Sequence, residues 1–273
     1  MPDPVCPSAA GSANLVAGDW PSLFEQITRQ RSVRMSKQFT AQTGNPFIAG
    51  NYRRVYSLGM DCRPRHLTRQ LELGCRRGPF DWIGGRSVAD LNQALQTRCK
   101  EVLLLKNLEP YEPDCKEYRK YADRAAGYLS AHDFAVENHD LVREYPAFRE
   151  KFDGICTRFF SELAELDSVL FFLSVALEEN EDWQFETPDE ILANTLTLKT
   201  TLEQLCPNAR VGLLVATFHD ELVEHSRPGL AFTRKYTFDN DEPWMQGQEL
   251  THWCNMLVGV NGFTGLAAHK ESA

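Results

Sequence analysis

The sequence predicts an α/β protein of three layers, in which a mostly parallel sheet carries helices on both faces. The first observation is a pair of continuous apolar runs, SVLFFLSV at 168–175 and ARVGLLVATF at 209–218. Both have the length of strands that are buried on both faces. The second observation is that helical patterns alternate with these runs. Strand, helix and strand in this order imply right-handed crossovers, which make the strands parallel.

The elements before these runs have shorter signals. Residues 53–59, RRVYSLG, predict a short buried strand. A helix follows at 64–73, because proline is tolerated in a first turn and Gly74 is a suitable C-cap. A second helix is expected at 87–98, with Ser87 as its N-cap and an acidic residue three positions later.

The later elements carry stronger patterns. Residues 127–134, GYLSAHDF, predict a short strand that ends in polar residues. The segment 148–166 is the clearest helix, because its apolar residues recur every three or four positions on one face. Another helix is predicted at 188–205. From His219 onward the chain is aromatic and acidic, and we expect an irregular segment that folds over the sheet edge.

Length and composition indicate one globular domain. The chain has 273 residues, of which 42% are hydrophobic and 25% are charged, and this length is enough to bury a sizeable core. Residues 1–50 are rich in Pro, Ser, Ala, Gly and Gln, so we expect a flexible N-terminal extension with at most one short helix at 20–30. Residues 51–273 are then a single α/β domain.

Several classes of protein are disfavoured. The net charge of −9 argues against nucleic-acid binding, which needs a basic face. No apolar run is long enough to cross a bilayer, and the N-terminus lacks the features of a secretory signal, so we expect a cytoplasmic protein without a membrane partner. The eight cysteines include no CxxC pair, which disfavours a disulfide framework and a zinc site. No phosphate loop or cofactor fingerprint is present, so no cofactor is expected.

Cys62 raises the main chemical question. It lies between the first predicted strand and the helix that follows, and ligands of open α/β sheets gather where strands end. A helix N-terminus stabilises a thiolate, and Gly59 permits close backbone approach, so N–H groups beside the thiol could form an oxyanion hole. Free cysteines also pack readily in cores. The residues alone leave a nucleophile and a buried thiol open.

His132 and Asp81 are the candidate partners of this thiol. His132 ends its predicted strand, which would place it at the same sheet edge as Cys62, where it could act as general base. It could equally be a strand-end histidine bonded to backbone. Asp81 comes from a separate loop and is a better orienting group than Asp133, which points away from its neighbour in sequence. Asp81 could also simply cap backbone N–H groups in a turn.

Three other histidines remain candidate bases. His66 lies four residues beyond Cys62, on the same helix face if that helix begins early. His219 follows the second apolar run, and His252 occurs late in the chain. The segment THWC at 251–254 is too sparse to predict a metal site.

Five motifs occur in a recognisable order: SLGMDC at 57–62, PFDW at 79–82, HDF at 132–134, RF at 158–159 and VLF at 169–171. Together they resemble a family of mostly bacterial proteins of unknown function, named putative papain-like cysteine peptidases, over about residues 55–174. The resemblance implies Cys62 as nucleophile and His132 as base, and it suggests that Arg158 reaches a carboxylate or the substrate. Two features depart from the family: DGIC at 153–156 replaces a basic pair, and the acidic C-terminal segment matches no part of its pattern.

The family name and the periodicity imply different folds. A papain-like fold sets its cysteine on a long helix that faces an antiparallel, barrel-like sheet. The apolar runs of this chain instead predict parallel α/β structure, which is similar to the layout of SGNH-type esterases. We follow the periodicity for the fold.

The expected function is cysteine-dependent hydrolysis or acyl transfer on an unidentified protein, peptide or glycan substrate. Cys62, His132 and Asp81 are the predicted catalytic residues. The residues expected to line the substrate pocket are Ser57, Gly59, Asp61, Trp82, Asp133, Arg158 and His219. Two alternatives remain: a non-catalytic binding protein that keeps the motif for folding, and an SGNH-like esterase or carbohydrate-active hydrolase with a late histidine as base. The sequence leaves the oligomeric state open.

Overall fold

A parallel sheet and an antiparallel sheet organise the chain in a computed structural model. The structure describes residues 44–60, 62–111, 118–136, 140–175, 186–236 and 245–263, which belong to one compact unit. Asp61 and most of the predicted N-terminal extension, including the helix expected at 20–30, lie outside the described residues.

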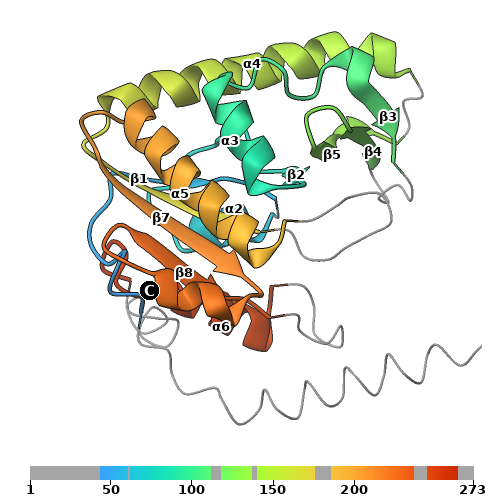
Figure 1. Cartoon of the computed structure of the whole chain (residues 1–273). Helices are drawn as coiled ribbons and strands as arrows, with labels where there is room; N and C mark the ends of the chain where they lie inside the picture. Colours follow the sequence, from blue (N-terminus) through green and yellow to red (C-terminus); the bar gives the residue numbers. More distant parts are fainter. Residues whose placement is uncertain are drawn as a thin grey trace, which may run out of the picture. The chain divides into compact units, whose positions relative to one another are not determined.

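The parallel sheet contains four strands in the order β1 (Arg54–Ser57), β6 (Ser168–Ser174), β7 (Arg210–Thr217) and β8 (Leu230–Arg234) (Figure 1). The two apolar runs of the sequence form the central strands β6 and β7, which pair in register from Ser168↔Arg210 to Ser174↔Ala216. Both are buried almost throughout, because each sheet face is covered. The prediction of a parallel α/β sheet is confirmed.

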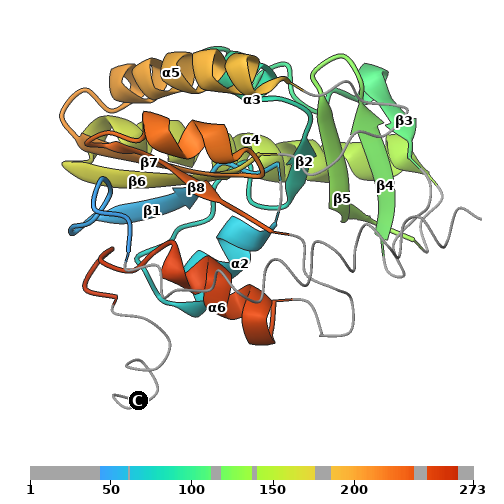
Figure 2. The ribbon, with the colours of Figure 1, turned by 60° about the horizontal axis from the view of Figure 1, so that its bottom comes forward.

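Helices cover both faces of this sheet, so the fold has three layers (Figure 2). One face packs against α2 (Arg63–Gln70) and α6 (Gly247–Asn255). The opposite face packs against α3 (Val88–Gln96), α4 (Leu141–Glu165) and α5 (Pro188–Leu205). Alternation along β6 divides the two cores, because Phe171 points to the α4 side and Phe172 to the α2 side.

The second sheet is antiparallel, in the order β2 (Ile83–Gly85), β5 (Tyr128–Ala135), β4 (Tyr118–Asp123) and β3 (Leu108–Pro110). This sheet corrects the placement of His132. The histidine lies inside β5, not at the edge of the parallel sheet. The reason is the short connection 124–127 between β4 and β5, since a parallel partner would need a crossover of about a dozen residues.

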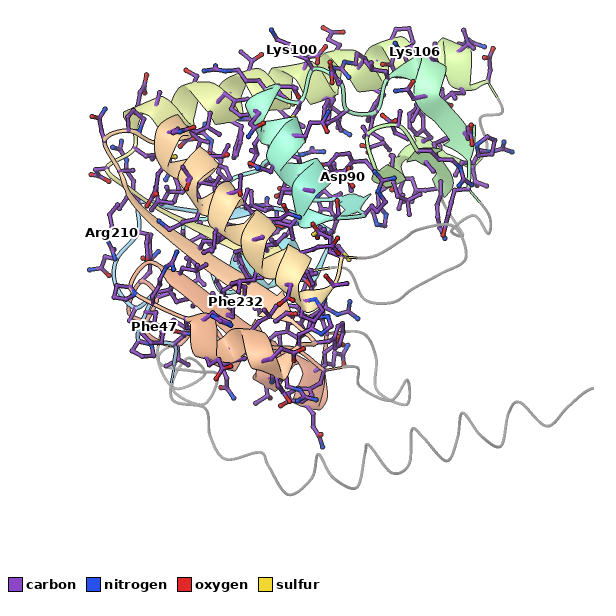
Figure 3. All side chains as sticks on the ribbon, in the orientation of Figure 1. Phe47, Asp90, Lys100, Lys106, Arg210 and Phe232 are labelled. Atoms are coloured by element: carbon purple, nitrogen blue, oxygen red, sulfur yellow. The ribbon has the colours of Figure 1, made fainter. Side chains whose placement is uncertain are left out.

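Caps explain where the helices begin. The Ser87 side chain accepts a hydrogen bond from the backbone N–H of Asp90 at 3.0 Å, as the sequence predicts, and Asp90 lies in the first turn of α3 (Figure 3). The helix α5 has the bounds predicted for it. In contrast, α4 begins at Leu141, seven residues before the predicted start, because Asp140 caps a polar first turn that apolar periodicity does not reveal.

The segments at both ends of the predicted domain are more ordered than the sequence indicates. Beyond His219 the chain forms the 3-10 helix η2 (Asp220–His225), then β8 and α6, where we expected irregular structure. Within the predicted extension, Ile48 is fully buried and the N–H of Gly50 donates to Gly259 O at 2.8 Å. A second 3-10 helix, η1 (Leu105–Asn107), precedes β3.

Candidate active site

The turn between β1 and α2 is sharply bent and tightly packed. Gly59 and Met60 both have left-handed backbone conformations, with φ of 77° and 62°. A Cβ atom on Gly59 would lie 2.6 Å from the carbonyl oxygen of Phe80, so only glycine fits there. Met60 adopts a conformation that costs a non-glycine residue about 1–3 kcal/mol. The rest of the structure therefore holds this turn in a strained form, as at the strand-to-helix turns that present nucleophiles.

Cys62 follows this turn as the N-cap residue of α2. Its side chain is in no disulfide and is half-buried, at the edge of the parallel sheet where β1 ends. Proline at position 64 has no N–H, so the backbone N–H groups of Arg63 and Arg65 are the donors of the first turn that the helix does not use. An anion at Cys62 would therefore meet the positive end of the helix dipole.

Ser57 and Gly59, two predicted pocket residues, shape the same turn. The Gly59 N–H donates to the Ser57 side-chain oxygen at 3.3 Å, and Ser57 is buried. The Gly59 N–H is thus engaged within the turn, and any oxyanion donors must come from the start of α2.

Asp81 connects the turn 78–82 to α2 through its contact with Arg65. Its carboxylate is buried, accepts a hydrogen bond from the Gly78 N–H at 3.0 Å, and lies 3.1 Å from Nε of Arg65. The contact with Arg65 lacks hydrogen-bond alignment, so its attraction is coulombic. Burial raises the pKa of Asp81 to about 7, and this effect outweighs the opposing influence of Arg65. The carboxylate makes no contact with His132 among the described residues.

His132 lies in the antiparallel sheet and contacts the turn 78–82 through Trp82. Its ring meets the rings of Trp82 and Tyr118 edge-on, with centroids 5.9 and 5.7 Å apart. The imidazole is exposed, and it forms no hydrogen bond with Cys62 within the described part of the chain. A chain of contacts nevertheless connects them: Arg65 lies one turn beyond Cys62 on α2, Arg65 pairs with Asp81, and Trp82 follows Asp81.

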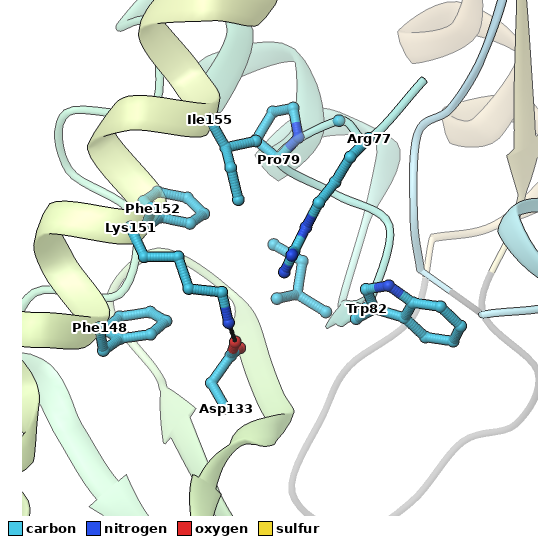
Figure 4. Close-up of a pocket in the computed structure, with 10 residues that line it drawn as sticks. Arg77, Pro79, Trp82, Asp133, Phe148, Lys151, Phe152 and Ile155 are labelled. Atoms are coloured by element: carbon cyan, nitrogen blue, oxygen red, sulfur yellow. Dashed lines mark hydrogen bonds and ion pairs between the residues drawn. The ribbon is translucent and has the colours of Figure 1, made fainter. Parts of the chain in front are cut away.

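A shallow, open pocket lies beside Trp82, between the turn 77–83, β5 and α4 (Figure 4). It includes two predicted pocket residues, Trp82 and Asp133. The Asp133 carboxylate accepts from the Ser130 hydroxyl at 3.0 Å and lies 3.2 Å from the ammonium group of Lys151. The pocket lining does not include Cys62. Arg158, on α4, donates to the Arg77 carbonyl at 3.2 Å and so fixes the backbone at the pocket mouth.

The remaining histidines have distinct settings. His219 follows β7 and is partly exposed, with Nδ1 3.8 Å from a carboxylate oxygen of Glu221. His66 lies on α2, and burial together with Arg69 lowers its pKa. His252 is buried with Nε2 3.0 Å from the Arg234 carbonyl oxygen, and burial lowers its pKa to about 4. The last of these is a core residue.

Sequence reasoning missed a buried lysine at the carboxyl edge of the parallel sheet. Lys235 is 1% exposed, and its Nζ donates to the Ser174 hydroxyl at 2.8 Å and to the Val175 carbonyl. Ser174 ends β6 and Thr217 ends β7, and both are fully buried. The polar residue next to last in each apolar run was a visible signal for this cluster. The lysine gave none, because its strand was not predicted.

Other site chemistries receive no support within the described residues. No group of three or more potential ligands there could hold a metal ion. The described cysteines form no disulfide with one another, and burial raises the pKa values of Cys206 and Cys254 to about 12, so neither is a reactive thiol. Among the described helices, none combines the length and apolar composition that a bilayer crossing requires.

Comparison with known proteins adds one finding. The model of a family described as putative papain-like cysteine peptidase matches residues 53–203. The match spans Cys62, the turn 78–82, His132 and the pocket on α4. No curated protein and no solved structure matches the chain significantly.

Proposed function

The chain belongs to the family of putative papain-like cysteine peptidases, and we propose that it is a cysteine-dependent hydrolase or acyltransferase with Cys62 as nucleophile. The strained turn before α2 carries this proposal. A left-handed, closely packed turn is costly to maintain, and its effect is to set Cys62 at a helix N-terminus on the sheet edge. This is the setting in which a thiolate is stabilised and a substrate can approach.

His132 is the general base in this proposal. It accepts the thiol proton, and the sulfur then forms a bond to the carbonyl carbon of the substrate while an electron pair moves onto oxygen. The N–H groups at the start of α2 stabilise this oxyanion. When this tetrahedral intermediate collapses, the amine or alcohol leaves and takes the proton from the imidazolium. In a hydrolase, water deprotonated by His132 then attacks the thioester and releases the acid and the Cys62 thiol. In an acyltransferase, another amine or alcohol attacks in place of water.

Asp81 is a positioning residue in this mechanism. Its contacts with Gly78 and Arg65 fix the distance between the turn that carries Trp82 and the helix that begins at Cys62. The ring of Trp82 in turn supports His132. Hydrogen bonds between catalytic groups are often long in a free enzyme and form when substrate binds.

Two experiments on the thiols test this proposal. In the first, iodoacetamide labels the native protein near neutral pH, and mass spectrometry reads the rate at each cysteine. Cys75 is the matched control, because it is likewise in no disulfide and half-buried but does not begin a helix. We expect Cys62 to react at least about tenfold faster than Cys75. In the second, p-nitrophenyl acetate should acetylate Cys62 and release nitrophenolate, and Cys62→Ser should abolish the acetyl adduct.

Equal labelling of Cys62 and Cys75, without an acetyl adduct, would reject the nucleophile. The binding-protein alternative would then stand. If Cys62 is acylated but His132→Asn leaves its rate unchanged while His219→Asn lowers it, the base is the late histidine. That alternative is supported by the place of His219 just beyond β7, at the carboxyl edge of the parallel sheet.

A further inference from the structure

The pocket beside Trp82 has one apolar wall and three charged side chains, of which Lys151 and Asp133 pair with each other and Arg77 is the third. The apolar wall comes from three consecutive turns of α4, where Phe148, Phe152 and Ile155 line the space (Figure 4). The guanidinium of Arg77 points into the space between these side chains and Trp82 (Figure 4). Apolar lining with a few well-placed polar groups is typical of a ligand site.

The carboxylates nearest to this pocket are already engaged. Asp133 interacts with Lys151 and Ser130, and Asp81 interacts with Arg65 and Gly78. Within the described residues, Arg77 forms no ion pair with a carboxylate. This cation at the mouth of the pocket is therefore available to an external anion, in a chain whose net charge is −9.

The geometry points to a ligand that carries an apolar group and a carboxylate together, and we propose that it is the C-terminal residue of a peptide with a large apolar side chain. The side chain lies against Phe148 and Phe152, and the carboxylate forms a charge-assisted pair with Arg77.

This inference rests on the proposed function for its choice of a peptide, because the pocket adjoins the proposed base. Trp82 lines the pocket and also contacts His132, and Asp133 follows His132 in the chain. A terminal residue held there would bring its peptide bond toward His132. The enzyme would then release single apolar residues from C-termini, or transfer acyl groups onto them.

The test measures binding apart from catalysis. The full-length Cys62→Ala variant is titrated by NMR with N-acetyl-L-phenylalanine, and with three matched probes: its carboxamide, N-acetyl-L-alanine and octanoate. We expect the phenylalanine acid to bind about tenfold or more tightly than either its amide or the alanine acid. Arg77→Gln should remove the preference for acid over amide. Arg143→Gln, which changes an exposed arginine in the first turn of α4 outside the pocket lining, should leave it intact.

Four results of these titrations would each contradict a different part of the proposal. Equal affinity for acid and amide, or a preference that survives Arg77→Gln, overturns the carboxylate site. Tighter binding of octanoate than of the phenylalanine acid overturns the peptide in favour of a fatty acid. Phe152→Leu should weaken the phenylalanine acid more than the alanine acid, and equal effects contradict the apolar contact. If Cys62 proves unreactive while these preferences hold, the proposed catalysis fails and the binding site remains.

Discussion

Nε of Arg65 lies 3.1 Å from Oδ2 of Asp81, and this contact joins the first turn of α2 to the buried turn 78–82. The aspartate is 1% exposed, and its other oxygen has no hydrogen-bond partner among the described residues. The pair connects the helix that follows the SLGMDC motif to the PFDW motif. Its removal should therefore disturb both stability and the setting of Cys62.

Arg65→Met should destabilise the protein more at high pH than at low pH. Removing the cation leaves a buried carboxylate without its coulombic partner, which costs about 3 kcal/mol near pH 8. Near pH 5 the loss should be smaller, because a carboxyl with a pKa of about 7 is protonated there. Urea unfolding at both pH values measures this. Arg124→Met removes an exposed pair with Glu109 and should cost less than about 1 kcal/mol at either pH.

Asp81→Asn should change the pH dependence of stability. The folded pKa of Asp81, about 7, is above its ordinary value of 3.8, so the folded state binds more protons between these values. The contribution of Asp81 is fully present below about pH 4 and is lost as pH rises through 7. The free energy of unfolding of wild type, relative to Asp81→Asn, should therefore fall across this window. A difference independent of pH would contradict the raised pKa.

His252 should produce the opposite slope. Its pKa falls from 6.5 to about 4 on folding because of burial, so the folded state binds fewer protons between these values. Stability should decrease as pH falls from about 6.5 to 4, by on the order of 3 kcal/mol. His252→Gln should remove this acid loss. The exposed His225, changed to Gln, is the control and should leave the slope unchanged.

Gly59→Ala should destabilise the protein, because the new Cβ would meet the Phe80 carbonyl and the backbone has a φ of 77°. A loss of more than about 1 kcal/mol is expected. Gly154→Ala is the matched control. It lies in α4 with open space around it, so alanine should stabilise the helix by about 0.5–1 kcal/mol. Thermal unfolding of both variants gives the comparison, and equal shifts would argue against a strained turn.

A panel of histidine variants should identify the base. His132→Asn should lower the rate of Cys62 alkylation and shift its pH profile, because the thiol loses its proton acceptor. His66→Asn and His219→Asn should leave both unchanged. The measurement is the iodoacetamide rate at Cys62 between about pH 5 and 9. A profile altered only by His66→Asn would assign the role to the neighbour on α2.

Local signals in the sequence determined much of the fold. The apolar runs form β6 and β7, the pattern at 188–205 forms α5, and Ser87 caps α3. These elements could be predicted because burial on both faces and helix capping each produce a pattern within a few adjacent residues. The motifs also placed Cys62 at the start of a helix and Asp81 in a turn. These features depend on spacings of a few residues, so one chain suffices to reveal them.

Tertiary structure alone decided which sheet each short strand joins. The residues at 127–134 predict a strand, but pairing across the turn 124–127 made it antiparallel and moved His132 away from the sheet edge. Likewise, the contact of Arg65 with Asp81 and the burial of Lys235 arise between segments distant in the chain. Pairing partners and desolvation are properties of the packed molecule, because they depend on which surfaces meet after the elements have formed.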